Sequence, residues 1–182
     1  MSNFGHDLSE LVTCTRCDLA ATRQRVVVGS GPRRAKVVVV GEAPGRQEDE
    51  GGEPFVGRSG QLLFRLLAEI GLSRDDCFVT NVVKCRPPAN RTPRPGEIAA
   101  CAPWLALQMA EMGGAPVLCL GATAARNVLG VARGIGVVHG RVVEVDGRQG
   151  VATYHPAAAL RGGERVVSVM RGDLEVLLGL LS

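Results

Sequence analysis

The chain has 182 residues, of which 46% are hydrophobic, and its net charge of +3 is too small to indicate a nucleic-acid partner by itself. This size supports one hydrophobic core, so we expect a single domain over residues 1–182. No apolar stretch approaches the ~20 residues of a membrane helix, and the polar segment 1–10 lacks the apolar centre of a signal peptide, which predicts a cytoplasmic protein.

Hydrophobic patterning predicts strands and helices that alternate along the chain. Strands are expected at 36–40, 77–83 and 116–120, and the two runs 141–145 and 151–154 flank Asp146-Gly147 as a hairpin or tight return. Helices are expected at 59–70, 97–112, 122–129 and 166–181. A Gly-rich loop is expected between Gly41 and Gly57. This order predicts a three-layer α/β/α domain with a central, mostly parallel sheet of about four strands.

Four of the six cysteines are spaced like metal ligands. These are the CxxC pair Cys14 and Cys17, and Cys85 and Cys101 on either side of a segment rich in Pro and Arg. Disulfides are rare in the reducing cytosol, so clustered cysteines there more often bind metal or serve redox chemistry. Four thiolates suit a structural zinc ion or an iron–sulfur cluster, and the CxxC spacing leaves that choice open. Cys77 and Cys119 lie in predicted strands and are expected to be buried thiols.

Basic residues gather in two segments that contain no acid. Residues 19–41 carry five cations, and residues 84–96 carry four, among them Arg86 and Arg91. Such runs suit contact with a phosphate backbone. The alternative is a solvated arginine-rich surface, because 19 of the 21 basic residues are Arg.

Polar side chains stand where the predicted strands end. Glu42 follows the first strand, Asn81 ends the second, and His155 follows the last. Because ligands bind at the carboxyl ends of parallel strands, these side chains are expected to converge on one crevice. Phe55 lies in the polar Gly-rich loop, where its ring would close over a planar ligand. Each of the polar residues has an alternative role in a turn or a cap, and Phe55 has one in the core.

Five segments that contain these residues resemble the family-four uracil-DNA glycosylases, which carry a 4Fe–4S cluster. The segments are 41–45 (GEAPG), 54–57 (PFVG), 80–88 (TNVVKCRPP), 90–93 (NRTP) and 155–161 (HPAAALR). The resemblance runs from about Cys14 to the final helix. It implies that the chain flips uracil out of DNA, hydrolyses the N-glycosidic bond and so begins base excision repair.

The resemblance also implies the roles of individual residues. The cluster would be held by Cys14, Cys17, Cys85 and Cys101. Phe55 would stack on uracil, Asn81 would bond its edge and His155 would lie near its O2, with Gly41 beside them. Ala43 stands where many members of the wider superfamily place an aspartate that directs water. We therefore assign the water-directing role to Glu42.

Uracil-containing DNA is the expected partner, and the chain is expected to act as a monomer. Arg86 and Arg91 are predicted to contact DNA. Leu160 and Arg161 follow the small-residue arm 157–159, which is predicted to enter the gap left by the flipped base. In the alternative interpretation this arm begins a helix and Leu160 packs inward.

Two other classes of function remain open at the level of sequence. A metal-dependent nuclease or phosphatase would bind magnesium through the acidic side chains of segment 42–53, namely Glu42, Glu48, Asp49, Glu50 and Glu53. A non-catalytic iron–sulfur module that binds DNA or serves redox chemistry is the third class.

Overall fold

The computed structural model describes residues 6–181, and its five strands form one sheet in the order β2-β1-β3-β5-β4. The strands are β1 (Val37–Gly41), β2 (Cys77–Asn81), β3 (Val117–Leu120), β4 (Val142–Val145) and β5 (Arg148–Thr153). Strands β2, β1, β3 and β5 run parallel, and β4 is antiparallel to β5. The predicted mostly parallel sheet is confirmed, with β4 as a fifth strand at its edge.

Burial explains the composition of the strands. Every residue of β1, β2 and β3 is buried, as expected of parallel strands covered on both faces, whereas β4 alternates between exposed and half-buried positions at its edge. Asp146 (φ 51°) and Gly147 (φ 76°) join β4 to β5, and two successive positive φ angles are the signature of a tight hairpin turn. The predicted hairpin is thereby confirmed.

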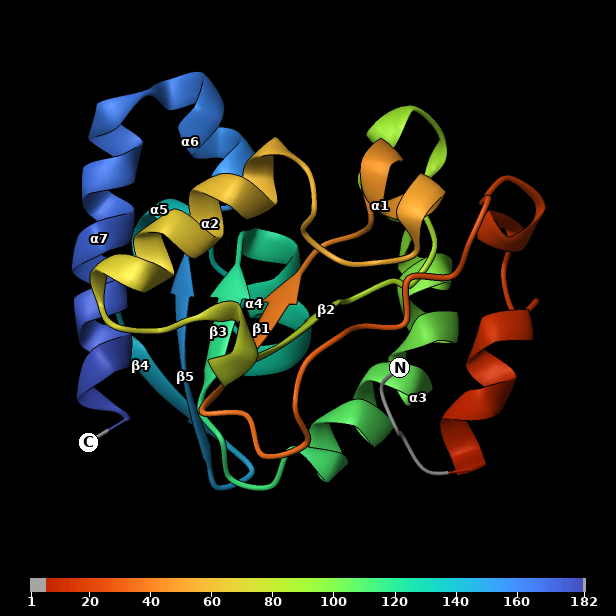
Figure 1. The fold of residues 1–182 in the computed structure, drawn as a ribbon, viewed down its shortest axis with the longest axis horizontal. Helices are drawn as coiled ribbons and strands as arrows, with labels where there is room; N and C mark the ends of the chain where they lie inside the picture. Colours follow the sequence, from red (N-terminus) through yellow and green to blue (C-terminus); the bar gives the residue numbers. More distant parts are fainter. Residues whose placement is uncertain (1–5, 182) are drawn as a thin grey trace.

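Helices cover both faces of the sheet, as Figure 1 shows. One face is covered by α2 (Arg58–Glu69), α6 (Pro156–Gly162) and α7 (Glu164–Gly179). The other is covered by α3 (Pro95–Glu111), α4 (Ala122–Leu129), α5 (Ile135–Val138) and the 3₁₀ helices η1 (His6–Thr13) and η2 (Asp18–Ala21). Short 3₁₀ helices η3 (Arg74–Asp76) and η4 (Pro88–Asn90) flank β2 and the segment that follows it. None of the described helices combines the length and the apolarity that a membrane crossing requires.

The segment 41–57 differs from the loop that the sequence predicts. It contains a short helix, α1 (Arg46–Gly51), which ends at Gly52 in the left-handed conformation (φ 82°). Six residues give too few turns for an apolar period to show, and four of the six are charged. The helix brings its acidic side chains back toward the protein, where they make the contacts described below.

The N-terminal segment is part of the core. Leu8, Leu11 and Leu19 are buried in the same hydrophobic cluster as Trp104 and Leu105 of α3. These contacts place the first pair of cysteines beside the helix that carries Cys101.

Candidate active site

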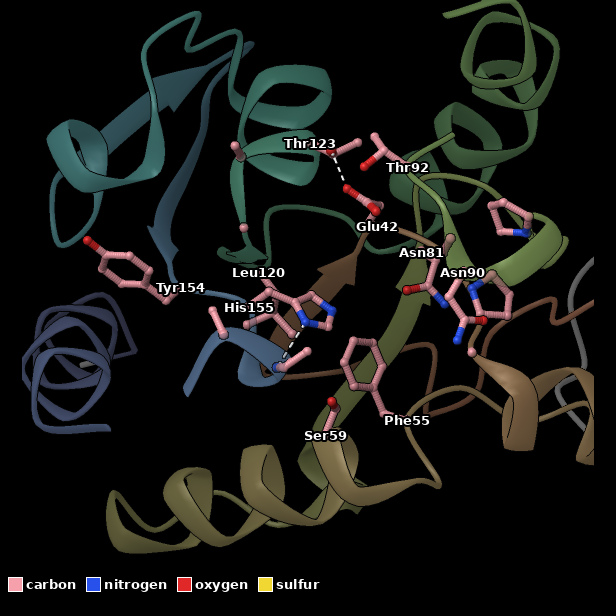
Figure 2. A pocket seen from close by; sticks show the side chains of 18 of the residues that line it. Glu42, Phe55, Ser59, Asn81, Asn90, Thr92, Leu120, Thr123, Tyr154 and His155 are labelled. Atoms are coloured by element: carbon pink, nitrogen blue, oxygen red, sulfur yellow. Dashed lines mark hydrogen bonds between the residues drawn. The ribbon is translucent and has the colours of Figure 1, made fainter. Parts of the chain in front are cut away.

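A cavity of about 690 Å³ lies at the carboxyl ends of the parallel strands. The register of β1 and β2 pairs Gly41 with Asn81, so the two strands end side by side. Figure 2 shows Glu42, Phe55, Asn81 and His155 around this cavity, as the sequence predicts for residues at strand ends. Four residues from four separate segments thus meet in one place.

Asn81 supplies an unusual polar atom. The side chain is 1% exposed, and among the side chains of residues 8–181 its Oδ1 is the one buried nitrogen or oxygen without a hydrogen-bond partner. A buried acceptor left unpaired costs free energy, on the order of 1–3 kcal/mol, so such atoms normally meet a ligand or water. The backbone behind it is fixed, because the Lys84 ammonium donates to the Asn81 carbonyl at 2.6 Å.

Gly41 makes room for two of the pocket residues. A Cβ atom at this position would lie 2.5 Å from Asn81 Oδ1 and 2.5 Å from Cζ of Phe55. Any side chain here would push the amide and the ring apart. The glycine at the end of β1 is therefore a requirement of the pocket.

Phe55 presents its ring to the cavity from a strained backbone. Its φ of 54° is left-handed, which is uncommon for a bulky residue, and its side chain is buried. The ring centroid lies 6.0 Å from that of His155, with 36° between the planes. The two rings therefore line neighbouring parts of the same cavity.

The surroundings of His155 favour a neutral imidazole and one of its two tautomers. It caps the N-terminus of α6, and its Nδ1 accepts the Ala157 N–H at 3.1 Å. Burial lowers the pKa of His155 to about 4, and the positive charge of Arg161 contributes to the shift. Because Nδ1 accepts, the ring proton resides on Nε2, which is free to donate.

Glu42 reaches the cavity from the opposite side and is held by Thr123. The Thr123 hydroxyl donates to Oε2 of Glu42 at 2.5 Å, as drawn in Figure 2. Thr123 lies in the first turn of α4, just after β3. Sequence reasoning missed it, although its place after a strand end is the signal that identified the other pocket residues.

Three of the four acidic side chains that follow Glu42 in this segment bind groups within the fold. Asp49 accepts the backbone N–H groups of Gln24 and Arg25, and Glu48 accepts those of Val56 and Gly57. Glu50 accepts a hydrogen bond from the Arg46 side chain. Asp49 is 2% exposed, so its contacts join α1 to the N-terminal segment inside the protein. Glu53 is exposed. These contacts occupy three of the five acidic side chains that suggested a magnesium site.

Two of the four predicted DNA-contact residues line the cavity. Arg91 and Arg161 line it, and Leu160 on α6 is exposed. Arg86 donates to the side chain of Asn90 at 2.7 Å. Arg91 is paired with Glu97 of α3 at 2.6 and 2.8 Å, so its charge is largely compensated. Contact of these four residues with DNA stays a prediction.

The four cysteines with ligand spacing gather beside α3. Cys85 and Cys101 are buried, and Cys14 and Cys17 pack against the same hydrophobic cluster. Burial raises the pKa of Cys85 to about 11, and the charges of Cys101 and Cys17 add to the shift. Burial also raises the pKa of Cys101, to which Cys17 and Cys14 contribute. None of the six cysteines forms a disulfide in the part of the chain that the structure describes.

Two of these sulfur atoms accept hydrogen bonds. The Trp104 indole N–H donates to Cys14 Sγ at 3.3 Å, and Arg23 donates to Cys85 Sγ at 3.4 Å. Donors of this kind favour thiolates, and a set of four thiolates fits an iron–sulfur cluster as well as zinc. Among the side chains of residues 8–181, the structure places no group of three or more His, Cys, Asp or Glu so that they could hold a metal ion.

Comparison with known proteins gives a consistent result. Residues 28–173 match the profile described as the uracil DNA glycosylase superfamily. A type-4 uracil-DNA glycosylase of Archaeoglobus fulgidus is 43% identical over 88% of this chain and 84% of its own length. A type-4 uracil-DNA glycosylase of Pyrobaculum aerophilum is 44% identical over 85% of this chain and 83% of its own. A type-5 uracil-DNA glycosylase of the same organism is 33% identical over 82% of this chain and 80% of its own length.

Proposed function

Because the chain belongs to the type-4 uracil-DNA glycosylases of the uracil DNA glycosylase superfamily, we propose that the cavity at the strand ends receives a uracil flipped out of DNA. The reaction is hydrolysis of the N-glycosidic bond, which leaves free uracil and an abasic site and begins base excision repair. One observation carries the assignment of the site. The unpaired Oδ1 of Asn81 is a buried acceptor that faces a cavity bounded by an aromatic ring and a neutral histidine.

Asn81 selects the base. Its Oδ1 accepts the uracil N3–H, and its amide NH₂ donates to O4. Cytosine presents the opposite pattern of donor and acceptor at these two positions, so its entry leaves buried polar groups unpaired. Discrimination of about 10⁴ is typical of a site built in this way.

Phe55 supplies the stacking face. Its ring is held against Gly41, which has no side chain to obstruct it. A base–aromatic stack is worth roughly 1–3 kcal/mol, and it is available to every base. Phe55 therefore contributes affinity for any flipped base, whereas Asn81 contributes specificity for uracil.

His155 stabilises the leaving group. Cleavage of the glycosidic bond places negative charge on uracil, and the Nε2–H of a neutral imidazole donates to O2 as that charge develops. One such donor in a desolvated site is worth roughly 3–4 kcal/mol in the transition state. The lowered pKa keeps the ring neutral at physiological pH, so it donates without a charge that would need to be compensated in the empty pocket.

Glu42 acts on the sugar side of the bond. Its Oε2 is occupied by the Thr123 hydroxyl, which leaves Oε1 to orient water or to stabilise the electron-poor sugar. Glu48 and Asp49 are the other carboxylates near this motif. Asp49 is buried and accepts two backbone N–H groups, and one oxygen of Glu48 also accepts two. We assign the role to Glu42 because it directly follows β1, at the strand ends that form the pocket.

DNA contacts surround the pocket mouth. Arg86, Arg91 and Arg161 meet phosphates, and Leu160 enters the space that the flipped base vacates. The exposure of Leu160 on α6 supports this over inward packing.

Cys14, Cys17, Cys85 and Cys101 hold a 4Fe–4S cluster in this proposal. A bound cluster supplies a cross-link and takes no part in the hydrolysis. The ligands come from the N-terminal segment, from the segment after β2 and from α3. Trp104 and Arg23 orient and stabilise two of the thiolates. The single domain over 1–182, the monomeric state and the cytoplasmic location stay predictions.

An oligonucleotide with one uracil, incubated with the protein in excess chelator, tests the function. The expected products are free uracil and an intact strand that breaks only on alkaline treatment. Direct strand cleavage that needs magnesium would instead identify a nuclease, and binding without release of uracil would identify a non-catalytic module.

A further inference from the structure

Arg74 lies outside the pocket but contacts the backbone that carries the stacking ring. Its Nη2 donates to the Pro54 carbonyl at 2.6 Å, and its Nη1 lies 3.4 Å from the Phe55 carbonyl. The guanidinium is also stacked over the Phe64 ring, with its Cζ 4.6 Å from the ring centroid. A planar group with several fixed donors is thus held between α2 and the turn that contains Phe55.

The turn needs such support because of the conformation of Phe55. The residue has a left-handed φ of 54°, which a bulky side chain rarely adopts unless its surroundings hold it there. On the opposite edge of the turn, Glu48 accepts the N–H groups of Val56 and Gly57 at 3.0 and 2.8 Å. Two carbonyl groups and two N–H groups of the turn are therefore bound by side chains from other segments.

Close packing explains why the conformation is not relieved. A Cβ atom on Gly60 of α2 would lie 1.7 Å from the Phe55 carbonyl oxygen, so the helix passes directly against the turn. Arg74 itself lies in η3, immediately before β2, the strand that ends in Asn81. One side chain therefore connects the ring of the pocket to the strand that presents the polar acceptor.

We propose that Arg74 is a positioning residue for uracil recognition, which holds the Phe55 ring where a flipped base stacks on it. The proposal rests on the proposed function. Without the guanidinium, the turn loses the two donors that fix its carbonyl groups, and Phe55 relaxes toward a negative φ. The ring then leaves its place above Gly41, and affinity for the base falls while affinity for the DNA backbone remains.

The test compares Arg74→Ala, Arg74→Lys and Phe55→Ala with the wild type, by two measurements. Inhibition by free uracil reports on the base pocket. Binding to an oligonucleotide with a stable abasic-site analogue reports on DNA contacts without a base. Arg74→Ala is expected to weaken uracil inhibition roughly tenfold, within the range for loss of one base–aromatic stack, and to change abasic-DNA binding less than about twofold.

A double-mutant cycle shows whether Arg74 acts through Phe55. If it does, Arg74→Ala adds almost nothing to the loss already caused by Phe55→Ala. Arg74→Lys should show an intermediate loss, because an ammonium is a point charge and lacks the planar fork. Arg65→Ala is the matched control, since it removes an exposed positive charge from the neighbouring α2.

The outcomes separate the proposal from the proposed function. A wild-type protein that releases no uracil refutes the function itself. Suppose instead that the wild type releases uracil. The role of Arg74 alone is then refuted if Arg74→Ala leaves uracil inhibition unchanged. It is also refuted if the losses of uracil affinity caused by Arg74→Ala and Phe55→Ala multiply in the double variant. If Arg74→Ala does not fold, as judged by thermal unfolding, the same cycle is run with Arg74→Lys and the same criteria apply.

Discussion

The hydroxyl of Thr123 donates a 2.5 Å hydrogen bond to Oε2 of Glu42 and so connects α4 to the end of β1 across the pocket. The two residues are 81 positions apart in the chain. A carboxylate with one oxygen fixed in this way can rotate little, so the other oxygen keeps a constant direction. Thr123 thereby fixes the direction in which Oε1 of Glu42 points.

Thr123→Val keeps the shape of the side chain and removes the donor. We expect the single-turnover rate of uracil excision to fall about tenfold or more, because a hydrogen bond to a charged acceptor is worth ~1.5–3 kcal/mol. Thr123→Ser, which restores the hydroxyl, should recover most of the rate. Equal losses in both variants would show that packing of the methyl group, and not the hydrogen bond, is what matters.

His155→Ala should fold normally and lose on the order of 10²–10³ in the chemical step, the usual loss for one donor to a developing anion. Single-turnover kinetics at saturating enzyme measure this step apart from DNA binding. In the wild type, His155 should stay neutral until the pH falls to about 4, because its native pKa is about 4. The part of the rate that depends on the neutral ring should be lost only there. Slower binding with an unchanged chemical step would instead indicate a DNA-contact role.

The lowered pKa of His155 also makes the stability of the fold fall as the pH falls. The unfolded histidine titrates near 6.5, above its native value, so the unfolded state binds the extra proton first as the pH falls. The contribution of His155 to stability is therefore lost between about pH 6.5 and 4 and levels off below. Denaturant unfolding of the wild type and of His155→Ala over this range should show a smaller pH dependence in the variant.

Asn81→Asp replaces the amide donor with an acceptor and should strongly reduce excision of uracil, since a carboxylate cannot donate to O4. Asn81→Ala should also be impaired, because it removes both contacts to the base edge. The measurement is the single-turnover rate on a uracil-containing duplex. Near wild-type turnover by Asn81→Ala would refute the base-reading role.

Metal content tests the cysteine assignment. Protein made under anaerobic, iron-replete conditions should be brown and contain iron, and Cys85→Ala should reduce the yield of folded protein more than Cys119→Ala does. Cys119 is a matched control because it is buried in β3, and burial alone raises the pKa of its thiol. If the protein contained stoichiometric zinc and no iron, the iron–sulfur cluster would be refuted, whereas the four cysteines would remain metal ligands.

Leu160→Ala and Arg161→Ala should impair excision from double-stranded DNA more than from single-stranded DNA, because only a duplex has a gap to fill. Leu160 is 42% exposed and Arg161 lines the cavity, so both can reach a bound strand. Rates on matched duplex and single-stranded substrates provide the comparison. An equal loss on both would leave only a general contact with the DNA backbone.

The sheet and the main pocket residues were predictable because both follow from local pattern. Strands buried on both faces read as apolar runs, and parallel strands bring their carboxyl ends to one edge. Glu42, Asn81 and His155 could therefore be grouped before any contact was known. Phe55 was identified by composition, as an aromatic residue in a polar loop.

Other features depend on contacts between distant segments and leave no periodic signal. Asp49 belongs to a short acidic helix and is buried only because it binds backbone groups 24 and 25 positions earlier. Arg74 reads as an ordinary charged residue before a strand, yet it contacts the turn of Phe55. Thr123 reads as a helix-start residue. Each side chain has an ordinary local role, and only the fold reveals its second partner.

Trp104 is the only tryptophan in the sequence, and its indole N–H donates to Cys14 Sγ. All tryptophan fluorescence of the protein therefore originates beside the cysteines, where the Arg16 guanidinium also lies 4.2 Å from the ring centroid. Loss of metal or loosening of the N-terminal segment should change this emission without any added label. Uracil that enters the pocket should not, because Trp104 does not line that cavity. Tryptophan emission thus reports on the cysteine region alone, even while the pocket is being filled.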